Sequence, residues 1–305
     1  MSAPQFTGIL AAVVTPLTPD GSAVDADGIR RQAEHIIGGG IHGLVPGGST
    51  GEFTTLSLDE RKRVTELYVE AAAGRVPVVA GTGALSTAET VELSVHAEKA
   101  GASAVMIVPP FYDAPAFDEL LGFFGAVSDA VDIPIMYYNI PSATGVRLAP
   151  EELAKLARET AITSYKDTGG DFTWFSTVQQ EHSRDITALN GWDTLTFAAL
   201  ASGAQAGVWG TASVIPGLCA ELYDALAVRG DLIAGRALWA KIFPICRFLE
   251  SHNYACGIKT GLDLVGVGAG PTRRPVLPLA PQYVEEFRGL LIAAGVAVAD
   301  ESVAA

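Results

Sequence analysis

Short apolar segments alternate with longer amphipathic ones along this chain, and this alternation constrains the fold more than any other feature of the sequence. The longer segments place apolar residues at helical spacing, whereas the short ones are rich in β-branched and apolar residues, as strands are. The alternating units occupy roughly the first 230 residues, which is the size of a (β/α)8 barrel. The expected strands are Gly8–Pro16, Gly43–Ser49, Val76–Gly83, Ala104–Pro110, Pro134–Asn139, Ile162–Asp167, Asp185–Gly191 and Gly207–Ala212. The expected helices between them include Asp25–Gly38, Leu58–Ala73, Ala88–Ala100 and Ala116–Ala130.

An open, doubly wound sheet is the competing architecture. It normally carries a glycine fingerprint after its first strand, but here that strand ends in Val14–Pro16. We therefore predict an α/β fold of the TIM-barrel type. Local signals mark several helix starts, namely the capping boxes of Ser57 with Glu60 and Ser86 with Glu89, and the proline Pro150.

The strand pattern stops near residue 230. Beyond it, Asp231–Leu249, Tyr254–Val265 and Pro281–Ala294 have helical character. We therefore expect residues 1–230 to form the catalytic barrel domain and residues 231–305 to form a C-terminal helical extension.

The composition excludes several classes of partner. A formal net charge of −14 argues against nucleic acid and against anionic membrane surfaces. The three cysteines, Cys219, Cys246 and Cys256, have no CxxC spacing and suggest no disulfide framework, which fits a reducing compartment. The N-terminal residues lack the pattern of a signal peptide, and no apolar run is long enough to span a bilayer. We expect a cytoplasmic protein.

Lys166 is one of only six lysines, and it alone stands where a buried strand is expected to end. Burial of an ammonium group is unfavourable, so a lysine at such a position tends to become a nucleophilic amine. This amine can condense with a ketone or an aldehyde to form a Schiff base. A salt-bridged lysine at the end of a strand is the alternative, and Lys166 alone does not decide between the two.

The C-terminal ends of the strands and the loops after them build the active site of a TIM barrel. In this chain they carry hydroxyls, phenols, glycines and one lysine, a set that suits proton transfer around a carbonyl group. None of the five histidines falls at an expected strand end, although metal-dependent barrels usually need them as ligands. Glu52 and Asp167 remain as candidates for Mg²⁺, and we expect no metal site. The strand-end segments are Thr15, Gly47–Glu52, Gly81–Gly83, Pro109–Tyr112, Tyr137–Pro141, Lys166–Asp167, Asn190–Asp193 and Trp209–Thr211.

The turn Gly48–Gly51 can offer backbone N–H groups and two hydroxyls to a carboxylate. An ordinary glycine-rich loop between a strand and a helix has the same composition. Tyr138 can likewise be a packed aromatic residue at the mouth of the barrel. The combination of these features with Lys166 is more specific than any one of them.

Together these residues make the chain similar to the family of dihydrodipicolinate synthase and N-acetylneuraminate lyase, the class I Schiff-base pyruvate aldolases. The resemblance extends over essentially the whole chain. It is carried by one motif per strand end, namely Gly48–Glu52, Val79–Gly83, Pro109–Tyr112, Tyr138–Pro141 and Lys166–Asp167.

The resemblance implies a catalytic role for four residues. Lys166 is expected to condense with the C2 carbonyl of pyruvate or another 2-oxo acid. Tyr138 is expected to relay protons to the carbinolamine and to the aldehyde oxygen, and Ser49 to continue this relay. Tyr112 is expected to contribute its phenol to the relay of a neighbouring subunit.

The resemblance also implies a set of substrate-binding positions. Thr50 and the backbone N–H groups around Gly48 and Gly51 are expected to hold the substrate carboxylate. Gly191 and Trp209 match positions that line the pocket. The covalent imine on Lys166 requires no further cofactor.

One position departs from the synthase branch of the family. Dihydrodipicolinate synthases usually carry an arginine after the Tyr-Asn-x-Pro motif that binds a substrate carboxylate, and Ala143 stands there in this chain. Arg147 is a possible substitute, although a bidentate arginine–carboxylate pair is not easily replaced. The segment Ser142–Gly145 and the serine at position 49 favour the aldolases and dehydratases of 2-keto-3-deoxy sugar acids.

We therefore predict a lyase that cleaves or forms a 2-keto-3-deoxy acid, with pyruvate and an aldehyde as the other reactants. Dihydrodipicolinate synthase, which forms 4-hydroxy-tetrahydrodipicolinate, and a 2-keto-3-deoxy sugar acid dehydratase are the alternatives. A non-catalytic sensor of pyruvate-like ligands is the alternative from outside the enzymes. The resemblance implies a homotetramer, a dimer of dimers, and no nucleic-acid or membrane partner is expected.

Overall fold

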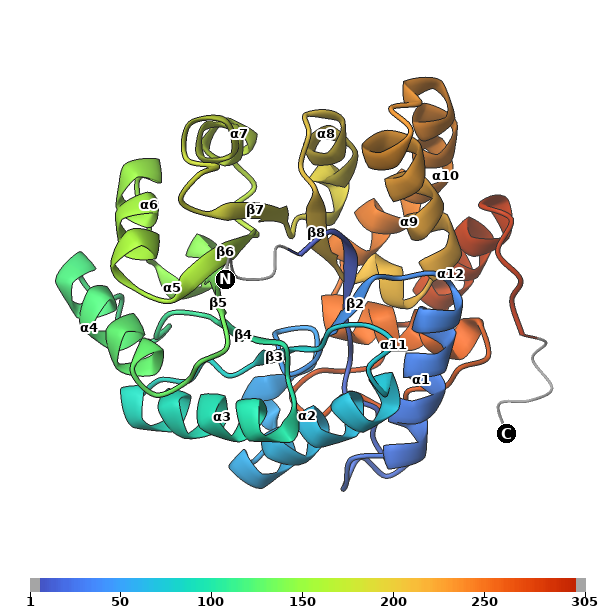
Figure 1. The fold of residues 1–305 in the computed structure, drawn as a ribbon. Coiled ribbons are helices and arrows are strands. Elements are labelled where there is room, and N and C mark those ends of the chain that lie inside the picture. The colour runs from blue at the N-terminus through green and yellow to red at the C-terminus, as the bar shows by residue number, and fades with distance from the viewer. Residues whose placement is uncertain (1–5, 300–305) are drawn as a thin grey trace.

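The computed structural model describes residues 6–299 and contains one sheet of eight parallel strands, each followed by at least one helix. The strand order is β2-β1-β8-β7-β6-β5-β4-β3, and a parallel bridge between Leu44 and Val78 brings the two edge strands together. The barrel is thus closed, as predicted, and the helices form a ring around it (Figure 1). The strands are β1 (Gly8–Ala12), β2 (Gly43–Val45), β3 (Val79–Gly81), β4 (Ala104–Ile107), β5 (Ile135–Asn139), β6 (Ile162–Asp167), β7 (Thr187–Asn190) and β8 (Ala206–Trp209).

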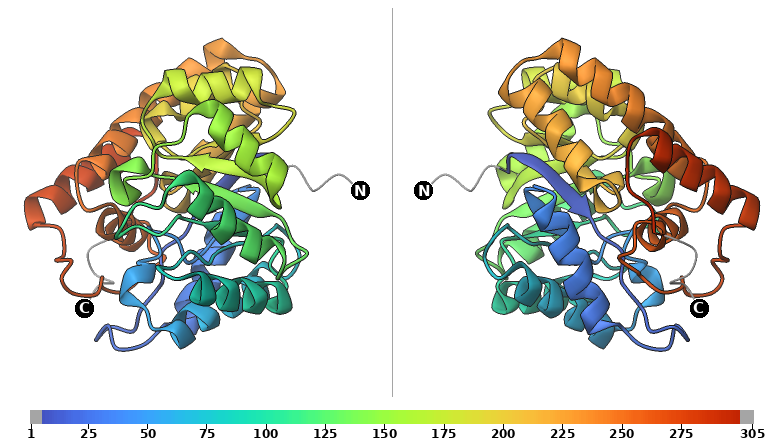
Figure 2. Two further views of the ribbon diagram at one scale, coloured as in Figure 1. Left: turned by 90° about the vertical axis from the view of Figure 1, so that its left-hand side faces the viewer. Right: turned by 90° about the vertical axis from the view of Figure 1, so that its right-hand side faces the viewer.

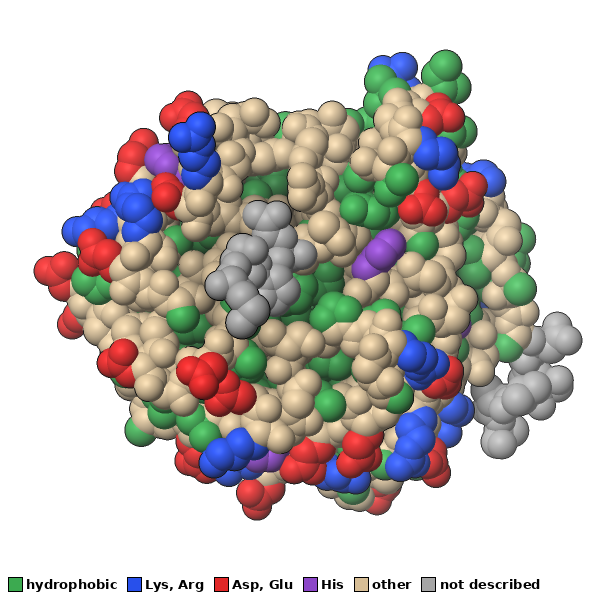
Figure 3. Space-filling view, viewed as in Figure 1, with side chains coloured by type: hydrophobic (Ala, Val, Ile, Leu, Met, Phe, Trp, Pro, Cys, Tyr) green, Lys and Arg blue, Asp and Glu red, His purple; other side chains and the backbone are tan. Residues whose placement is uncertain are grey.

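The helices of the barrel follow the strands along the chain and cover their outward faces. They are α1 (Ala26–Gly38), α2 (Leu58–Ala72), α3 (Thr87–Ala100), α4 (Phe117–Ser128), α5 (Pro141–Thr144), α6 (Pro150–Glu159), α7 (Phe172–Glu181), α8 (Thr196–Ala201) and α9 (Pro216–Tyr223). Short 3-10 turns and one π-helical turn complete this part, namely η1 (Phe53–Thr55), η2 (Asp193–Leu195), η3 (Thr211–Ser213) and η4 (Asp224–Val228). Charged side chains lie mainly around the periphery of the face seen in Figure 3, over the helices.

The expected strands are confirmed in number and order, but most are shorter than predicted. The first ends at Ala12 and not at Pro16, and the second ends at Val45 and not at Ser49. The difference arises because the last residues of these apolar runs are loops at the C-terminal edge of the barrel. The loop after β2 carries the predicted site residues Ser49 and Thr50.

The local helix signals are borne out to different degrees. Ser57 and Glu60 form both hydrogen bonds of the capping box, and Pro150 is the first residue of α6. At the start of α3 only the Ser86 side chain caps the helix, accepting from the N–H of Glu89. The Glu89 carboxylate instead lies 3.7 Å from the guanidinium of Arg61.

Side chains along each strand alternate between the barrel interior and the surrounding helices, as the pleat of a strand requires. Met136 and Tyr138 of β5 belong to the cluster of buried residues inside the barrel. Tyr137, between them, packs in the layer between the strands and helices such as α4. This alternation decides which strand-end residues can reach a site inside the barrel mouth.

Three further helices, α10 (Leu232–Glu250), α11 (Tyr254–Leu264) and α12 (Pro281–Ala293), form the C-terminal part of the structure. They lie together on one side of the barrel (Figures 1 and 2). Their apolar residues, such as Ile242, Leu262 and Phe287, share one buried cluster with Ile9 of β1. The division at residue 230 remains a prediction. Within residues 6–299 no helix is long and apolar enough to cross a membrane.

Candidate active site

A cavity of about 360 Å³ opens at the C-terminal ends of the strands. We call it the main cavity. One wall consists of residues from strands β1, β5, β6 and β8 and from the loops that follow β2, β5, β6, β7 and β8. The other wall comes from the junction of α10 and α11. It is lined by Ala12, Ser49, Thr50, Tyr138, Ile140, Lys166, Thr168, Gly191, Trp192, Asp193, Val208, Gly210, Glu250, Asn253, Tyr254 and Ala255.

Lys166 and Tyr138 stand side by side in the main cavity. They are direct partners in the register of β6 and β5, so both side chains point into the barrel. The Lys166 side chain is 6% exposed, and its Nζ lies 4.3 Å from the centre of the Tyr138 ring. Among the ion pairs of residues 6–299, none involves Lys166. No carboxylate of this part of the chain therefore competes with a substrate for the amine.

Gly191 makes room for the lysine. A Cβ atom at this position would lie 2.6 Å from both Cγ and Cε of Lys166. The glycine follows β7, and its N–H donates to the carbonyl of Asp167, so its backbone is fixed beside β6. The absence of a side chain at 191 is therefore a condition for the observed position of Lys166.

The hydroxyl residues Ser49 and Thr50 reach the main cavity from the loop after β2. This loop is tightly folded, because the Thr15 hydroxyl donates to the carbonyl of Gly51 at 2.8 Å and the N–H of Glu52 donates to the carbonyl of Ser49 at 3.0 Å. Gly51 is packed so closely that an added Cβ would lie 3.1 Å from the nitrogen of Gly47.

The predicted binding residues Gly48 and Gly51 lie outside the lining of the main cavity. Gly48 borders a small neighbouring cavity of about 10 Å³, together with Ser49 and Tyr138. The two glycines therefore shape the turn that presents Ser49 and Thr50.

Trp209 is not at the main cavity, contrary to the expectation from the resemblance. Its neighbour Val208 lines the cavity, and alternation along β8 turns the Trp209 side chain outward. There it is 1% exposed and its ring centre lies 6.4 Å from that of Trp239 in α10. The structure does not place Trp209 where it can touch a substrate.

Tyr112 is also not among the residues that line the main cavity. It lies in the loop between β4 and α4 and is 87% exposed. Of the four predicted catalytic residues, the chain brings Lys166, Tyr138 and Ser49 together and leaves Tyr112 on the surface.

The structure adds a buried polar group that the sequence pattern did not single out. Asp193 follows β7 and lines the main cavity, and its Oδ2 accepts hydrogen bonds from the N–H and the hydroxyl of Thr211, at 3.2 and 2.5 Å, and from the hydroxyl of Tyr254. Burial raises the pKa of the Asp193 carboxyl to about 6. Its position at a strand end was a visible signal, but the partner Tyr254 comes from α11.

Glu250 brings a second carboxylate to the same wall. It is the last residue of α10, and it accepts hydrogen bonds from the N–H and the hydroxyl of Thr194, both at 2.9 Å. Burial raises the pKa of the Glu250 carboxyl. The Thr194 hydroxyl also accepts from the indole N–H of Trp192, which lies at the cavity edge. No strand-end pattern could have revealed Glu250, because it comes from the C-terminal helices.

The two carboxylates considered for a metal, Glu52 and Asp167, are bound to separate protein groups. Asp167 accepts from the Asn139 amide at 2.7 Å, and burial raises its pKa to about 6. Glu52 lies 2.7 Å from the ammonium of Lys259. Among the described residues, no three His, Cys, Asp or Glu side chains form a group that could hold a metal ion.

Arg147, the possible substitute for the missing arginine, does not line the main cavity. It borders a different cavity of about 80 Å³, beside Asp167, Asp171 and Trp174. The cavity that Arg147 borders shares no lining residue with the main cavity.

The barrel fold agrees with what comparisons with known proteins find. The family model described as the dihydrodipicolinate synthetase family matches residues 5–294. The chain belongs to this family. The resemblance drawn from the strand-end motifs is thereby confirmed.

Curated members of the dihydrodipicolinate synthetase family are similar over nearly their whole length. The 4-hydroxy-tetrahydrodipicolinate synthase of Methanopyrus kandleri is 38% identical, over 89% of this chain and 91% of that protein. The enzyme of the same name from Nitrobacter hamburgensis is also 38% identical, over 95% of this chain and 97% of the relative.

Solved structures of the family have the same fold. The dihydrodipicolinate synthase of Aquifex aeolicus superposes with a TM-score of 0.91 at 30% identity, covering 97% of this chain and 100% of that one. The chloride-inhibited dihydrodipicolinate synthase of Acinetobacter baumannii, complexed with pyruvate, also gives 0.91, at 31% identity, with 96% and 100% covered. One structural relative in this family has therefore been seen with pyruvate bound.

Proposed function

We propose that this member of the dihydrodipicolinate synthetase family is a class I lyase that forms a Schiff base between Lys166 and pyruvate. It would cleave or form a 2-keto-3-deoxy acid, with an aldehyde as the second product or substrate. The observation that carries the proposal is the placement of the Lys166 amine 4.3 Å from the Tyr138 ring in a cavity that Ser49 and Thr50 also line.

The reaction in the direction of cleavage begins with attack of the neutral Lys166 amine on the C2 carbonyl carbon of the substrate. The carbinolamine loses one water molecule and becomes an iminium ion. Removal of the proton from the C4 hydroxyl lets the C3–C4 bond break, and its electron pair moves into the iminium to give an enamine and a free aldehyde. Protonation at C3 and addition of water to C2 then release pyruvate and regenerate the amine. The condensation follows the same steps in reverse.

Three side chains of this chain have roles in these steps. Tyr138 would donate a proton to the leaving hydroxyl of the carbinolamine and accept the proton of the C4 hydroxyl. Ser49, which lines the same cavity, would continue this proton transfer. Thr50 and the N–H groups of its turn would bind the substrate carboxylate. No metal or organic cofactor takes part in this scheme.

The charge of the main cavity favours an aldehyde without a second carboxylate. Among the described residues that line it, Lys166 is the only base, whereas Asp193 and Glu250 are acids. A second carboxylate on the substrate would find no arginine partner there, because Ala143 replaces the usual one and Arg147 borders another cavity. Hydroxyl groups, in contrast, could donate to the acidic wall.

The names of the curated relatives favour a second candidate, the synthesis of 4-hydroxy-tetrahydrodipicolinate from pyruvate and aspartate semialdehyde. It shares the imine and the enamine with the first candidate. A dehydratase also shares the imine, since loss of water from the bound acid needs the same electron sink. A sensor of pyruvate-like ligands would bind pyruvate in the main cavity without turnover.

The assembly and the compartment are part of the proposal. We infer a homotetramer, a dimer of dimers, in which the exposed Tyr112 of one subunit enters the relay of a neighbour. The net charge of −14 and the three dispersed cysteines support a cytoplasmic protein without nucleic-acid or membrane partners.

Trapping with sodium borohydride tests the imine directly. Wild type treated with pyruvate and borohydride is expected to gain one pyruvate-sized adduct by intact-mass spectrometry, and Lys166→Ala to gain none. Lys155→Ala, which removes an exposed lysine of α6, is the matched control and is expected to behave as wild type. Absence of an adduct in wild type would overturn the proposal.

The choice of aldehyde separates the two candidates. Wild type is expected to turn over pyruvate with a neutral hydroxyaldehyde such as glyceraldehyde more efficiently, by kcat/KM, than with aspartate semialdehyde. The reverse order would establish the synthase. Adduct formation without any turnover would support the sensor.

A further inference from the structure

We propose that the buried ion pair between Glu52 and Lys259, together with Arg273, positions the Ser49–Thr50 turn for binding of the substrate carboxylate. The C-terminal helices would in this way control the pyruvate half of the site. The proposal rests on the function proposed above, and it concerns residues that touch no substrate themselves.

Glu52 directly follows the turn and is held in an unusual backbone conformation. Its φ angle is 57°, in the left-handed region that residues other than glycine seldom adopt. The side chain is only 6% exposed. Such a conformation persists where surrounding contacts enforce it, and these often occur at functional sites.

Both contacts that hold the Glu52 carboxylate come from the C-terminal part of the chain. Its Oε2 lies 2.7 Å from Nζ of Lys259 in α11, and its Oε1 accepts from the backbone N–H of Arg273 at 3.1 Å. Lys259 is 3% exposed, and its ammonium also donates to the carbonyl of Pro271 at 2.7 Å. Burial lowers the pKa of Lys259, so the paired carboxylate is what favours its charged form. Removal of one partner from such a buried pair leaves the other charge uncompensated.

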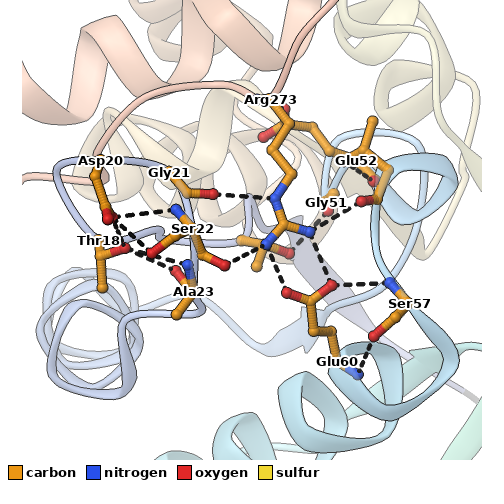
Figure 4. A network of polar contacts seen from close by, with 12 residues as sticks. Thr18, Asp20, Gly21, Ser22, Ala23, Gly51, Glu52, Ser57, Glu60 and Arg273 are labelled. Carbon is orange, nitrogen blue, oxygen red and sulfur yellow. Dashed lines mark hydrogen bonds and ion pairs between the residues drawn. The ribbon is translucent and has the colours of Figure 1, made fainter.

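The side chain of Arg273 also binds the segment between β2 and α2 that contains Glu52 (Figure 4). Its guanidinium donates to both carboxylate oxygens of Glu60, at 2.5 and 2.8 Å, and to the carbonyl of Thr55 at 2.9 Å. It also donates to the carbonyls of Gly21 and Ser22, at 3.2 and 3.3 Å. The hydrogen bonds from the Arg273 guanidinium lower the pKa of the Glu60 carboxyl to about 2. Arg273 therefore joins the loop after β1, the loop after β2 and the start of α2.

Helix α11 consequently contacts both halves of the site. Its first residues, Tyr254 and Ala255, line the main cavity opposite the barrel, where the aldehyde half of a substrate would lie. Five residues after Tyr254, Lys259 holds the residue that follows the Ser49–Thr50 turn. Lys259 contacts Glu52 and Pro271 and does not line the main cavity, so its replacement is expected to alter the turn more than the lysine nucleophile on β6.

The test measures how adduct formation depends on pyruvate concentration. In Lys259→Met and in Glu52→Gln, the pyruvate concentration that gives half-maximal borohydride trapping is expected to rise at least tenfold. The adduct at saturating pyruvate is expected to remain on Lys166. Lys62→Met is the matched control, because Lys62 pairs with Glu92 of α3 and not with Glu52, and it is expected to keep the wild-type value.

Two further observations keep the test decisive. Circular dichroism and thermal unfolding establish that each variant is folded, and Glu52→Gln, which keeps an oxygen to accept from Arg273, serves where Lys259→Met does not fold. A folded Glu52→Gln with the wild-type dependence on pyruvate, and only a lowered melting temperature, would overturn the positioning role. If wild type itself formed no adduct, the proposed function would fail instead, so the two failures are distinct.

Discussion

Lys166 faces Tyr138 across β6 and β5 because the register of these two strands shifts by one residue below them. Ile135 pairs with Ile162, but the next residue, Met136, pairs with Ser164, so β6 carries one extra residue at this point. Without the bulge Tyr138 would pair with Tyr165, whose side chain packs among the outer helices. The bulge therefore brings the nucleophile and the phenol to the same level of the barrel, in accord with the frequent location of bulges beside active sites.

Replacement of Tyr138 by phenylalanine separates the role of the phenolic hydroxyl from that of the aromatic ring. The ring beneath the Lys166 amine is kept, but the proton transfer is lost, and loss of a general acid–base group typically lowers kcat by roughly 10²- to 10⁴-fold. Steady-state turnover and the rate of borohydride trapping measure both effects. A kcat within twofold of wild type would exclude Tyr138 from the proton transfer.

Replacement of Gly191 by alanine tests the space that Lys166 requires. The new methyl would lie 2.6 Å from two carbons of the lysine side chain, so the amine must move. We expect adduct formation to slow at least tenfold and the free energy of unfolding to fall by about 1–3 kcal/mol, as in other overpacked sites. Gly217→Ala, where an added Cβ meets no atom within 4 Å, is the control. Unchanged trapping in Gly191→Ala would show that the lysine adapts freely.

Two tryptophans near the strand ends are expected to behave differently. Trp192 lines the main cavity, so Trp192→Ala is expected to change the KM for the aldehyde several-fold and leave pyruvate trapping unaltered. Trp209 packs outward against α10, so Trp209→Phe is expected to lower stability by about 1–3 kcal/mol with both KM values unchanged. A changed KM for the aldehyde in Trp209→Phe would show that Trp209 contributes to substrate binding.

Asp193 makes the stability depend on pH in a predictable direction. Burial raises its pKa from 3.8 to about 6, so the folded state binds this proton more tightly than the unfolded state. The stability contributed by the protonated carboxyl is therefore lost as the pH rises from about 4 to above 6, by up to about 3 kcal/mol. Urea unfolding of wild type and Asp193→Asn at pH 4.5 and 7.5 measures this. Asp193→Asn is expected to lose less stability over that range, and an identical loss would contradict the assignment.

Tyr112 tests the proposed assembly. If its phenol serves a neighbouring subunit, Tyr112→Phe is expected to lower kcat at least tenfold. Analytical ultracentrifugation is expected to find the proposed tetramer in both wild type and Tyr112→Phe. Because Tyr112 is exposed in a single chain, its replacement is expected to change the free energy of unfolding of that chain little. Full activity in Tyr112→Phe would remove this residue from the catalytic set, whatever the oligomeric state.

The barrel and one wall of its site follow from local patterns in the amino-acid sequence. Alternation of short strands with amphipathic helices is a local property, because it follows from the two side-chain periods of strand and helix. Once a barrel is predicted, the ends of its strands must meet at one mouth, so the order of the strands is enough to predict that Lys166, Tyr138 and Ser49 lie together. Composition and motifs do not predict which other residues complete the cavity around these three side chains.

The opposite wall, and the side on which each strand-end residue faces, depend on how the folded chain packs. Glu250 and Tyr254 line the main cavity, and Lys259 pairs with Glu52, because α10 and α11 dock on the barrel through apolar packing between residues far apart in sequence. Trp209 points outward because strand parity, and not proximity to the strand end, sets its direction. The docking of α10 and α11 has no local period, so no pattern in the sequence could have revealed it. The direction of Trp209 follows the local period of a strand, but the exact ends and register of β8 had to be known to apply it.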